Sequence, residues 1–262
     1  MRLSAALLVA GLSATAMLGG FVVVTQQSDM DNIQSQYIST VDGSSTRKYL
    51  QITKRAETVK SETTEDSNNT NPPSSSEPTV GADGLIYGNG GNKVPLYLQG
   101  DPQWGNYWPA DHVYGTSLSV SGCGYTSLAM AISYATGTTV LPTEIADKYC
   151  RTHHTASSGI SWSAFTVAPP DYGLKVQAIG HDINALAEGL KQGKVAVASN
   201  VPGSEPDRFS TGGHIICIRG VDENGNFLVN NPNSRGMEQL NLPYPPEKMQ
   251  NYIKQEWLIW KE

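Results

Sequence analysis

The pattern of apolar and polar residues divides the chain into three parts. Residues 3–24 are uncharged and mainly apolar, within a first segment of residues 1–25. Residues 26–83 contain scattered apolar side chains without a repeating face, and residues 61–79 consist only of Ser, Thr, Asn, Asp, Glu and Pro. Such a composition cannot offset the entropy of ordering, so we predict a disordered Ser/Thr/Asn-rich stalk over 26–83. Aromatic and aliphatic residues then recur, which predicts one folded domain over residues 84–262.

Three segments of this domain have the apolar spacing of helices: 123–135, 143–150 and 183–192. Asp182 is a candidate N-cap of the last one, and Gly193 is its stop signal. In the first segment the apolar residues at helical spacing are Leu128, Ala131, Ile132 and Ala135.

Four apolar segments predict strands: 195–199, 215–221, 226–230 and 256–260. Asp222–Gly225 has the composition of a turn, so the second and third strands should form a hairpin. Pro95–Gln99 is a short extended segment. Because the helices come before most of the sheet in the sequence, we expect an α+β domain.

The uncharged N-terminal segment is long enough to span a bilayer. Ala14–Ala16 resembles a signal-peptidase site, but the apolar run continues beyond it to Val24. We favour an uncleaved signal anchor over a cleaved signal peptide, and a cytosolic helix is the remaining alternative. Positive charge before the segment, and none after it until Arg47, orients the rest of the chain outwards. We therefore expect an exported protein, extracellular or at the cell surface, that contacts the membrane only through residues 3–24.

Charge and cysteine content exclude several classes. The chain has 18 basic and 24 acidic residues, a net charge of -6, which disfavours nucleic-acid binding by bulk charge. Three Cys cannot form a disulfide scaffold. We expect Cys150 and Cys217 to be buried free thiols, with a disulfide as the alternative. His153 and His154 beside Cys150 lack a fourth ligand, so we predict neither a metal nor a cofactor.

Cys123 lies at the start of the first predicted helix, between Gly122 and Gly124. Unpaired backbone N–H groups and the positive end of the helix dipole favour a thiolate there. The two glycines would let the backbone approach a substrate closely. The ordinary alternative is a small buried residue at a helix start, because free Cys is often buried.

His214 follows two glycines at the start of the predicted strand 215–221. A Cys nucleophile needs a base that is adjacent in space rather than in sequence, and an amide or carboxylate in segment 226–232 could orient that base. Alone, this His is more often a core residue, and the Asn-Pro in that segment is a common loop dipeptide. The combination with Cys123 favours catalysis.

The domain resembles papain-like cysteine peptidases related to the bacteriocin-processing, double-glycine-leader peptidases, in their extracytoplasmic branch. The resemblance covers roughly residues 94–260. It is carried by four motifs in order: Val94–Gln99 followed by Asp101–Trp104, Ser121–Met130, Gly212–His214 and Val229–Pro232.

The resemblance implies a papain-like fold, in which a helical part carrying the Cys packs on an antiparallel sheet carrying the His. By position, Cys123 would attack, His214 would act as base and then acid, Asn231 would orient His214, and Gln99 would donate to the oxyanion. The family usually has Asp where this chain has Asn231, although papain-like enzymes also use Asn. Asn230 is the neighbouring alternative, but strand alternation points it to the opposite face.

These features predict a cell-surface cysteine peptidase that acts on a peptide or protein. A cell-wall amidase or endopeptidase with the same chemistry is an alternative, as is a non-catalytic binding module of the same fold. We expect a monomer. Trp104, Tyr107 and Trp108 could form a substrate or glycan platform, although packing beside the cleft is the more ordinary role for them. Gly84–Asn92 lacks the Lys and helix of a phosphate loop and is interpreted as a connecting loop.

Overall fold

The computed structural model describes residues 78–109, 116–155 and 159–262. The predicted signal or anchor segment and nearly all of the predicted stalk lie outside these residues. Strand β1 (Thr79–Val80) precedes residue 84, the predicted start of the domain, and pairs with β2 (Ile86–Tyr87), which pairs with β3 (Pro95–Leu96). Within the described residues, no helix has both the length and the apolar content needed to cross a bilayer.

A five-stranded antiparallel sheet is the centre of the domain, with the strand order β6-β10-β7-β8-β9. All four predicted strands of this sheet are present. The bounds are Lys175–Gly180 for β6, Val195–Asn200 for β7, Ile215–Val221 for β8, Phe227–Asn230 for β9 and Ile253–Trp260 for β10. Strand β6 was not predicted, because it is an edge strand without fully buried side chains and has no apolar run.

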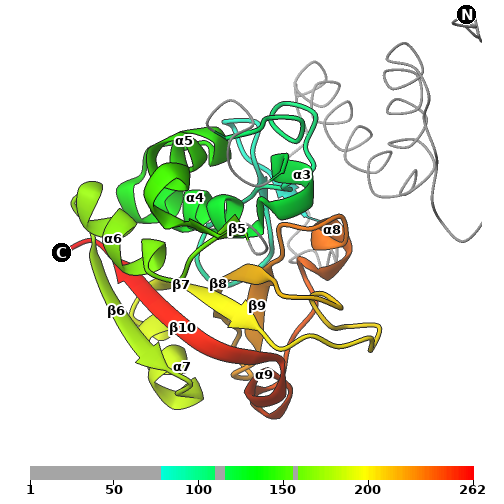
Figure 1. The fold of residues 1–262 in the computed structure, drawn as a ribbon. Coiled ribbons are helices and arrows are strands. Elements are labelled where there is room, and N and C mark those ends of the chain that lie inside the picture. The colour runs from blue at the N-terminus through cyan, green and yellow to red at the C-terminus, as the bar shows by residue number, and fades with distance from the viewer. Residues whose placement is uncertain (1–77, 110–115, 156–158) are drawn as a thin grey trace, which may run out of the picture. The chain divides into compact units, whose positions relative to one another are not determined.

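Helices cover both faces of this sheet (Figure 1). Helix α4 (Cys123–Thr136) packs on β7, β8 and β10 from one side, and α7 (Ile183–Lys191) packs on the same strands from the other. Because both faces are covered, β7 is buried at every position. Val195 and Val197 belong to the core under α4, and the alternate residues Ala196 and Ala198 belong to the core under α7.

The predicted helices are all present. The first is α4, the second is α5 (Pro142–His153) and the third is α7. Asp182 caps α7 as predicted, since its carboxylate accepts a hydrogen bond of 2.9 Å from the backbone N–H of Ala185. The chain leaves this helix through Gly193, whose φ of 81° is in the left-handed region.

Four further helices were not predicted. They are α3 (Leu118–Ser121), α6 (Ala164–Asp171), α8 (Gly236–Gln239) and α9 (Pro246–Tyr252). Three are too short for a periodic pattern. The last turn of α6 contains Pro169 and Pro170, residues that normally indicate a helix break. A small hairpin, β4 (His154–Thr155) and β5 (Gly159–Ile160), completes the described elements.

The glycine-rich segment that precedes β3 lies against the buried side chain of Arg219, in the middle of β8. The guanidinium donates to the carbonyl oxygens of Asn89, Gly90 and Leu240. A Cβ atom at Gly88 would lie 2.5 Å from Nη2 of Arg219. This segment is therefore a packed connection. The hydrogen-bond acceptors of the buried guanidinium are backbone carbonyl oxygens rather than a carboxylate.

Candidate active site

Cys123 is the first residue of α4, directly after the short helix α3. Both flanking glycines are required by packing. A Cβ at Gly122 would lie 2.3 Å from the carbonyl oxygen of Leu118, and a Cβ at Gly124 would lie 2.1 Å from Cγ2 of Ile160. This corrects the interpretation that the glycines leave room for a substrate, because the protein itself fills that space.

The sheet brings His214 and Asn231 together. His214 immediately precedes β8, and Asn231 immediately follows β9, the strand paired with it. Helix α4 approaches the same end of β8, where the Ser127 hydroxyl donates to the carbonyl oxygen of Ile215 over 3.1 Å. The start of the helix and the ends of the two strands therefore converge on one point, although they are far apart in the sequence.

A hydrogen-bonded series links the three side chains. Nε2 of His214 lies 2.7 Å from Oδ1 of Asn231, and the Cys123 thiol is hydrogen-bonded to the same imidazole. Since Nε2 faces Asn231, Nδ1 is the ring nitrogen left for the thiol. His214 is 8% exposed and Asn231 is fully buried, so water is largely excluded from their contact.

The surroundings favour a charged Cys123–His214 pair. Burial raises the pKa of the Cys123 thiol, but the charge of His214, its hydrogen bond and the backbone N–H groups of Ile215 and Gly124 lower that pKa below its ordinary value of 9.0. Burial lowers the pKa of His214, but the charge and hydrogen bond of Cys123 and the hydrogen bond of Asn231 together raise that pKa above 6.5. The arrangement thus stabilises thiolate beside imidazolium, the reactive form of a cysteine nucleophile.

Gln99 lies at the same site, on the segment that follows β3. Its backbone N–H donates to the carbonyl oxygen of Pro232 over 2.6 Å, and its Nε2 donates to the carbonyl oxygen of Ser119 over 2.8 Å. The Ser119 bond uses one of the two amide hydrogens of Gln99. A cleft of about 230 Å³ opens here, lined by Gln99, Val120, Ser121, Cys123, Ser210, Gly213, His214 and Asn233.

Asn230 does not share this site. Its Nδ2 donates to the carbonyl oxygens of Val94 and Pro95, over 3.0 and 3.1 Å, on the other side of β9. The structure therefore selects Asn231 over Asn230 as the partner of His214, as strand alternation predicted. Asn230 instead holds the segment that leads to Gln99.

The other candidate residues lie away from the cleft. Trp104 is buried, and its indole N–H donates to the carbonyl oxygen of Leu98 over 2.8 Å. The Tyr107 hydroxyl donates to the Asp147 carboxylate. Neither Trp104 nor Tyr107 is among the residues that line the cleft. Cys150 and Cys217 are buried free thiols. Among the described residues, no group of three or more His, Cys, Asp or Glu side chains could hold a metal ion.

Two residues at or behind the site escaped sequence reasoning. Asn233 lines the cleft, and Gln239 is fully buried and hydrogen-bonded to Asn231. Neither has a sequence signal of its own. Asn233 stands in a loop rich in Asn and Pro, and Gln239 is in a four-residue helix.

A thiol at the start of a helix, with His and Asn at neighbouring ends of an antiparallel sheet, defines the class of papain-like cysteine peptidases. The chain belongs to the Peptidase_C39 like family, whose family model matches residues 92–262. It is therefore a cysteine peptidase, a hydrolase related to the double-glycine peptidases.

Two solved structures are similar to this chain. The peptidase domain of Streptococcus ComA, a bi-functional ABC transporter involved in a quorum-sensing pathway, is 14% identical with a TM-score of 0.41, over 55% of this chain and 93% of that chain. A double glycine motif protease from an AMS/PCAT transporter, in complex with the leader peptide, is 18% identical with a TM-score of 0.40, over 66% of this chain and 94% of that chain. No curated protein matches the chain.

Proposed function

We propose that this protein is an exported cysteine peptidase that hydrolyses peptide bonds, with Cys123 as nucleophile and His214 as base and then acid. Asn231 orients His214 in this proposal. The observation that carries it is the hydrogen-bonded series from the Cys123 thiol through His214 to Asn231. A nucleophile, a base and an orienting group within hydrogen-bond reach are the geometric requirement of this chemistry.

The first step is attack by the Cys123 thiolate on the carbonyl carbon of the scissile bond. His214 has already taken the thiol proton, so it carries the positive charge next to the nucleophile. A bond forms between sulfur and carbon, and the carbonyl π electrons move to oxygen. The lowered pKa of Cys123 and the raised pKa of His214 support this starting state.

Gln99 stabilises the resulting oxyanion in this proposal. Ser119 accepts one hydrogen of the Gln99 amide, which holds the amide at the edge of the cleft with its second hydrogen available. The backbone N–H of Cys123 is the second donor, because the first N–H groups of a helix have no acceptor within it. One such donor contributes roughly 2.7–4 kcal/mol in related chemistry.

The remaining steps release the two products. The oxyanion collapses, the carbon–nitrogen bond breaks, and the leaving amine takes the proton from His214. A water molecule then attacks the thioester carbon while His214 accepts its proton. The carbon–sulfur bond breaks, the carboxylic acid is released, and the enzyme returns to thiolate beside imidazolium. His214 needs no other partner for either proton transfer.

The chemistry is tested with a peptide electrophile that carries a thiol-reactive group. We expect the wild-type protein to be labelled at Cys123, and the Cys123→Ala and His214→Ala variants to remain folded and unlabelled there. Cys150→Ser is the matched control, because Cys150 is a buried thiol outside the cleft. Labelling of Cys123→Ala at another thiol, to the wild-type extent, contradicts the assignment.

The substrate class is tested with a peptide library beside purified peptidoglycan. We expect cleavage of library peptides that depends on Cys123. Release of peptides from peptidoglycan alone would assign the protein as a wall amidase, and labelling without any cleavage would assign it as a binding module. Either result contradicts the peptidase proposal.

Export is proposed from the uncharged residues 3–24 and from the positive charges of Arg2 and the α-amine before them. An external protease added to intact cells tests it, because an exported domain is degraded without lysis. Deletion of residues 3–24 should leave the domain protected inside the cell.

A further inference from the structure

The amide of Asn231 makes hydrogen bonds at both of its ends. Its oxygen faces His214 and also accepts a hydrogen bond of 3.2 Å from the backbone N–H of Asn233. Its Nδ2 donates to Oε1 of Gln239 over 2.6 Å and to the carbonyl oxygen of Phe209 over 3.1 Å. Gln239 is the last residue of α8 and is fully buried. It therefore lies behind the proposed triad and touches neither Cys123 nor the cleft.

The direction of these hydrogen bonds is set by backbone carbonyl groups. Nε2 of Gln239 donates to the carbonyl oxygens of Arg208 and Asp207, over 3.0 and 3.4 Å. A carbonyl oxygen can only accept, so Gln239 has to turn its NH₂ group towards the loop and its oxygen towards Asn231. Asn231 must then offer NH₂ to Gln239 and its oxygen to His214. Reversal of either amide would place oxygen against oxygen.

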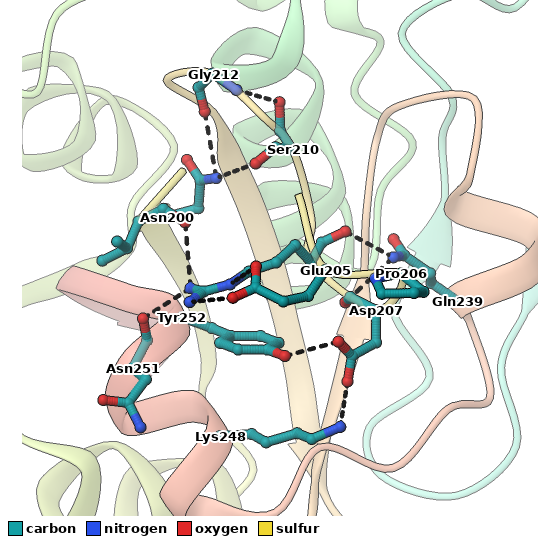
Figure 2. Close-up of polar contacts among 12 residues, drawn as sticks. Asn200, Glu205, Pro206, Asp207, Ser210, Gly212, Gln239, Lys248, Asn251 and Tyr252 are labelled. Atoms are coloured by element: carbon teal, nitrogen blue, oxygen red, sulfur yellow. Dashed lines mark hydrogen bonds and ion pairs between the residues drawn. The ribbon is translucent and has the colours of Figure 1, made fainter. Parts of the chain in front are cut away.

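The loop that supplies these carbonyl groups is held in place from several sides (Figure 2). Asp207 accepts hydrogen bonds from the Tyr252 hydroxyl, over 2.6 Å, and from Lys248. Further along the loop, Asn200 donates to the carbonyl oxygens of Ser210 and Gly212. The acceptors are thus fixed relative to the sheet.

Phe209 anchors the middle of the same loop. Its buried ring packs against the rings of Tyr244 and Tyr252, with centroids 5.0 and 5.9 Å apart. Its carbonyl oxygen also accepts a hydrogen bond of 2.6 Å from Nδ2 of Asn233. The carbonyl oxygen that faces Asn231 therefore belongs to a rigid, packed residue.

We propose that Gln239 is a positioning residue that fixes the amide of Asn231, and with it the tautomer of His214. In this arrangement His214 must carry a proton on Nε2, which leaves Nδ1 to exchange its proton with Cys123. The same polarity makes the site specific for Asn at position 231. A carboxylate there would direct its second oxygen at two acceptors, Gln239 and Phe209. This proposal rests on the proposed roles of Cys123 and His214.

The test measures alkylation of Cys123 by iodoacetamide as a function of pH, with peptide mapping by mass spectrometry to follow Cys123 alone. The pH of the half-maximal rate reports thiolate formation. In Gln239→Met we expect that pH to rise by about half a unit or more, the size expected when a hydrogen bond to a buried group is lost. An unchanged midpoint overturns the proposal.

Arg235→Met is the matched control for loosening of the loop. The Arg235 side chain donates to the carbonyl oxygens of Arg208 and Pro206, and among the described hydrogen bonds none joins it to the Asn231 amide. We expect this variant to keep the wild-type midpoint. If it shifts as far as Gln239→Met does, loop loosening explains both shifts and the proposal fails.

A double variant tests whether Gln239 acts through Asn231. Asn231→Ala should raise the alkylation midpoint, and adding Gln239→Met should raise it no further. A purely structural role predicts that the two shifts add, which would overturn the proposal.

Asn231→Asp tests the polarity with little change in volume, independently of whether Gln239→Met folds. We expect the carboxyl group to be held in its neutral form between two acceptors, so the midpoint does not fall below that of wild type. If the residue at position 231 acted without the polarity set by Gln239, the alkylation midpoint should fall, because a carboxylate there would stabilise the imidazolium of His214. A fall of half a pH unit or more contradicts the proposed polarity.

Alkylation needs no peptide substrate, so it separates this proposal from the proposed function. If the wild-type protein cleaves no peptide but the midpoints shift as expected, the peptidase proposal fails and the positioning role of Gln239 stands. If peptides are cleaved and the midpoints do not move, the peptidase proposal stands and the positioning role of Gln239 fails.

Discussion

Oδ1 of Asn231 lies 2.7 Å from Nε2 of His214, and both groups are shielded from water. This contact joins the ends of two neighbouring strands and assigns the other imidazole nitrogen to the Cys123 thiol. It also places a neutral amide, rather than an acid, against the imidazole of His214. Five predictions rest on this geometry and on the packing around it.

The pH dependence of peptide cleavage should be bell-shaped. The pKa of Cys123 is lowered from 9.0, so the thiolate persists as pH falls below 9.0 and is lost only at the lowered pKa. The pKa of His214 is raised from 6.5, so the imidazolium persists as pH rises above 6.5 and is lost at the raised pKa. Values of kcat/KM across pH 4–10 test this window. A single rise centred near pH 9 would indicate an unperturbed thiol and contradict the prediction.

Asn231→Ala should narrow the same profile: the alkaline limb moves to lower pH, while the acid limb rises with the alkylation midpoint. The Asn231 hydrogen bond is one of the contacts that raise the pKa of His214, so its loss lets the imidazolium deprotonate at lower pH. Asn230→Ala is the neighbouring control, since Asn230 bonds only the backbone of Val94 and Pro95 among the described contacts. Asn230→Ala should lower the free energy of unfolding of the domain, while the alkaline limb of the pH profile stays at the wild-type pH.

Gln99→Ala should lower kcat by about 10²–10³-fold, the effect of losing one oxyanion donor. Alkylation of Cys123 by iodoacetamide forms no oxyanion, so its rate should stay near the wild-type rate. Steady-state kinetics on a cleaved peptide and the alkylation rate are compared in the same preparation. Equal losses in both measurements would show that Gln99 supports the structure of the site instead.

Gly124→Ala should destabilise the domain by roughly 1–3 kcal/mol, because the new methyl group overlaps Cγ2 of Ile160. Ile160→Ala removes that atom, so the double variant should lose less stability than the two single changes summed. Ile160→Val keeps Cγ2 and is the matched control, with no such compensation expected. Urea unfolding of all five variants and wild type gives the coupling energy, and strict additivity in the Ala pair would refute the contact.

Arg219→Met should destabilise the domain by about 2–4 kcal/mol, because three carbonyl oxygens, including those of Asn89 and Gly90, lose their buried donor. Arg219→Lys should not restore stability, since one ammonium cannot reproduce the fork of the guanidinium. Thermal unfolding measures the loss. Labelling of Cys123 below the unfolding temperature should continue, and its disappearance in the folded variant would contradict a purely structural role for Arg219.

Local sequence signals predicted the parts of the fold that depend on neighbouring residues. The N-cap at Asp182, the turn before β9 and the apolar runs of β7, β8 and β10 all act within a few residues. Strand β6 and helix α6 lack such signals, because an edge position and a proline-containing last turn are tolerated only through packing on the rest of the domain.

The sequence by itself determined an α+β domain and the candidates Cys123, His214, Asn231 and Gln99. Only the tertiary structure decided which atoms of these residues meet. It showed that other atoms of the protein occupy the space beside Gly122 and Gly124. It also showed that Gln239 is hydrogen-bonded to Asn231 and that backbone oxygens accept the hydrogen bonds of Arg219. The physical reason is that a buried polar group is stable only with a partner in the right direction, and that partner lies far away along the chain.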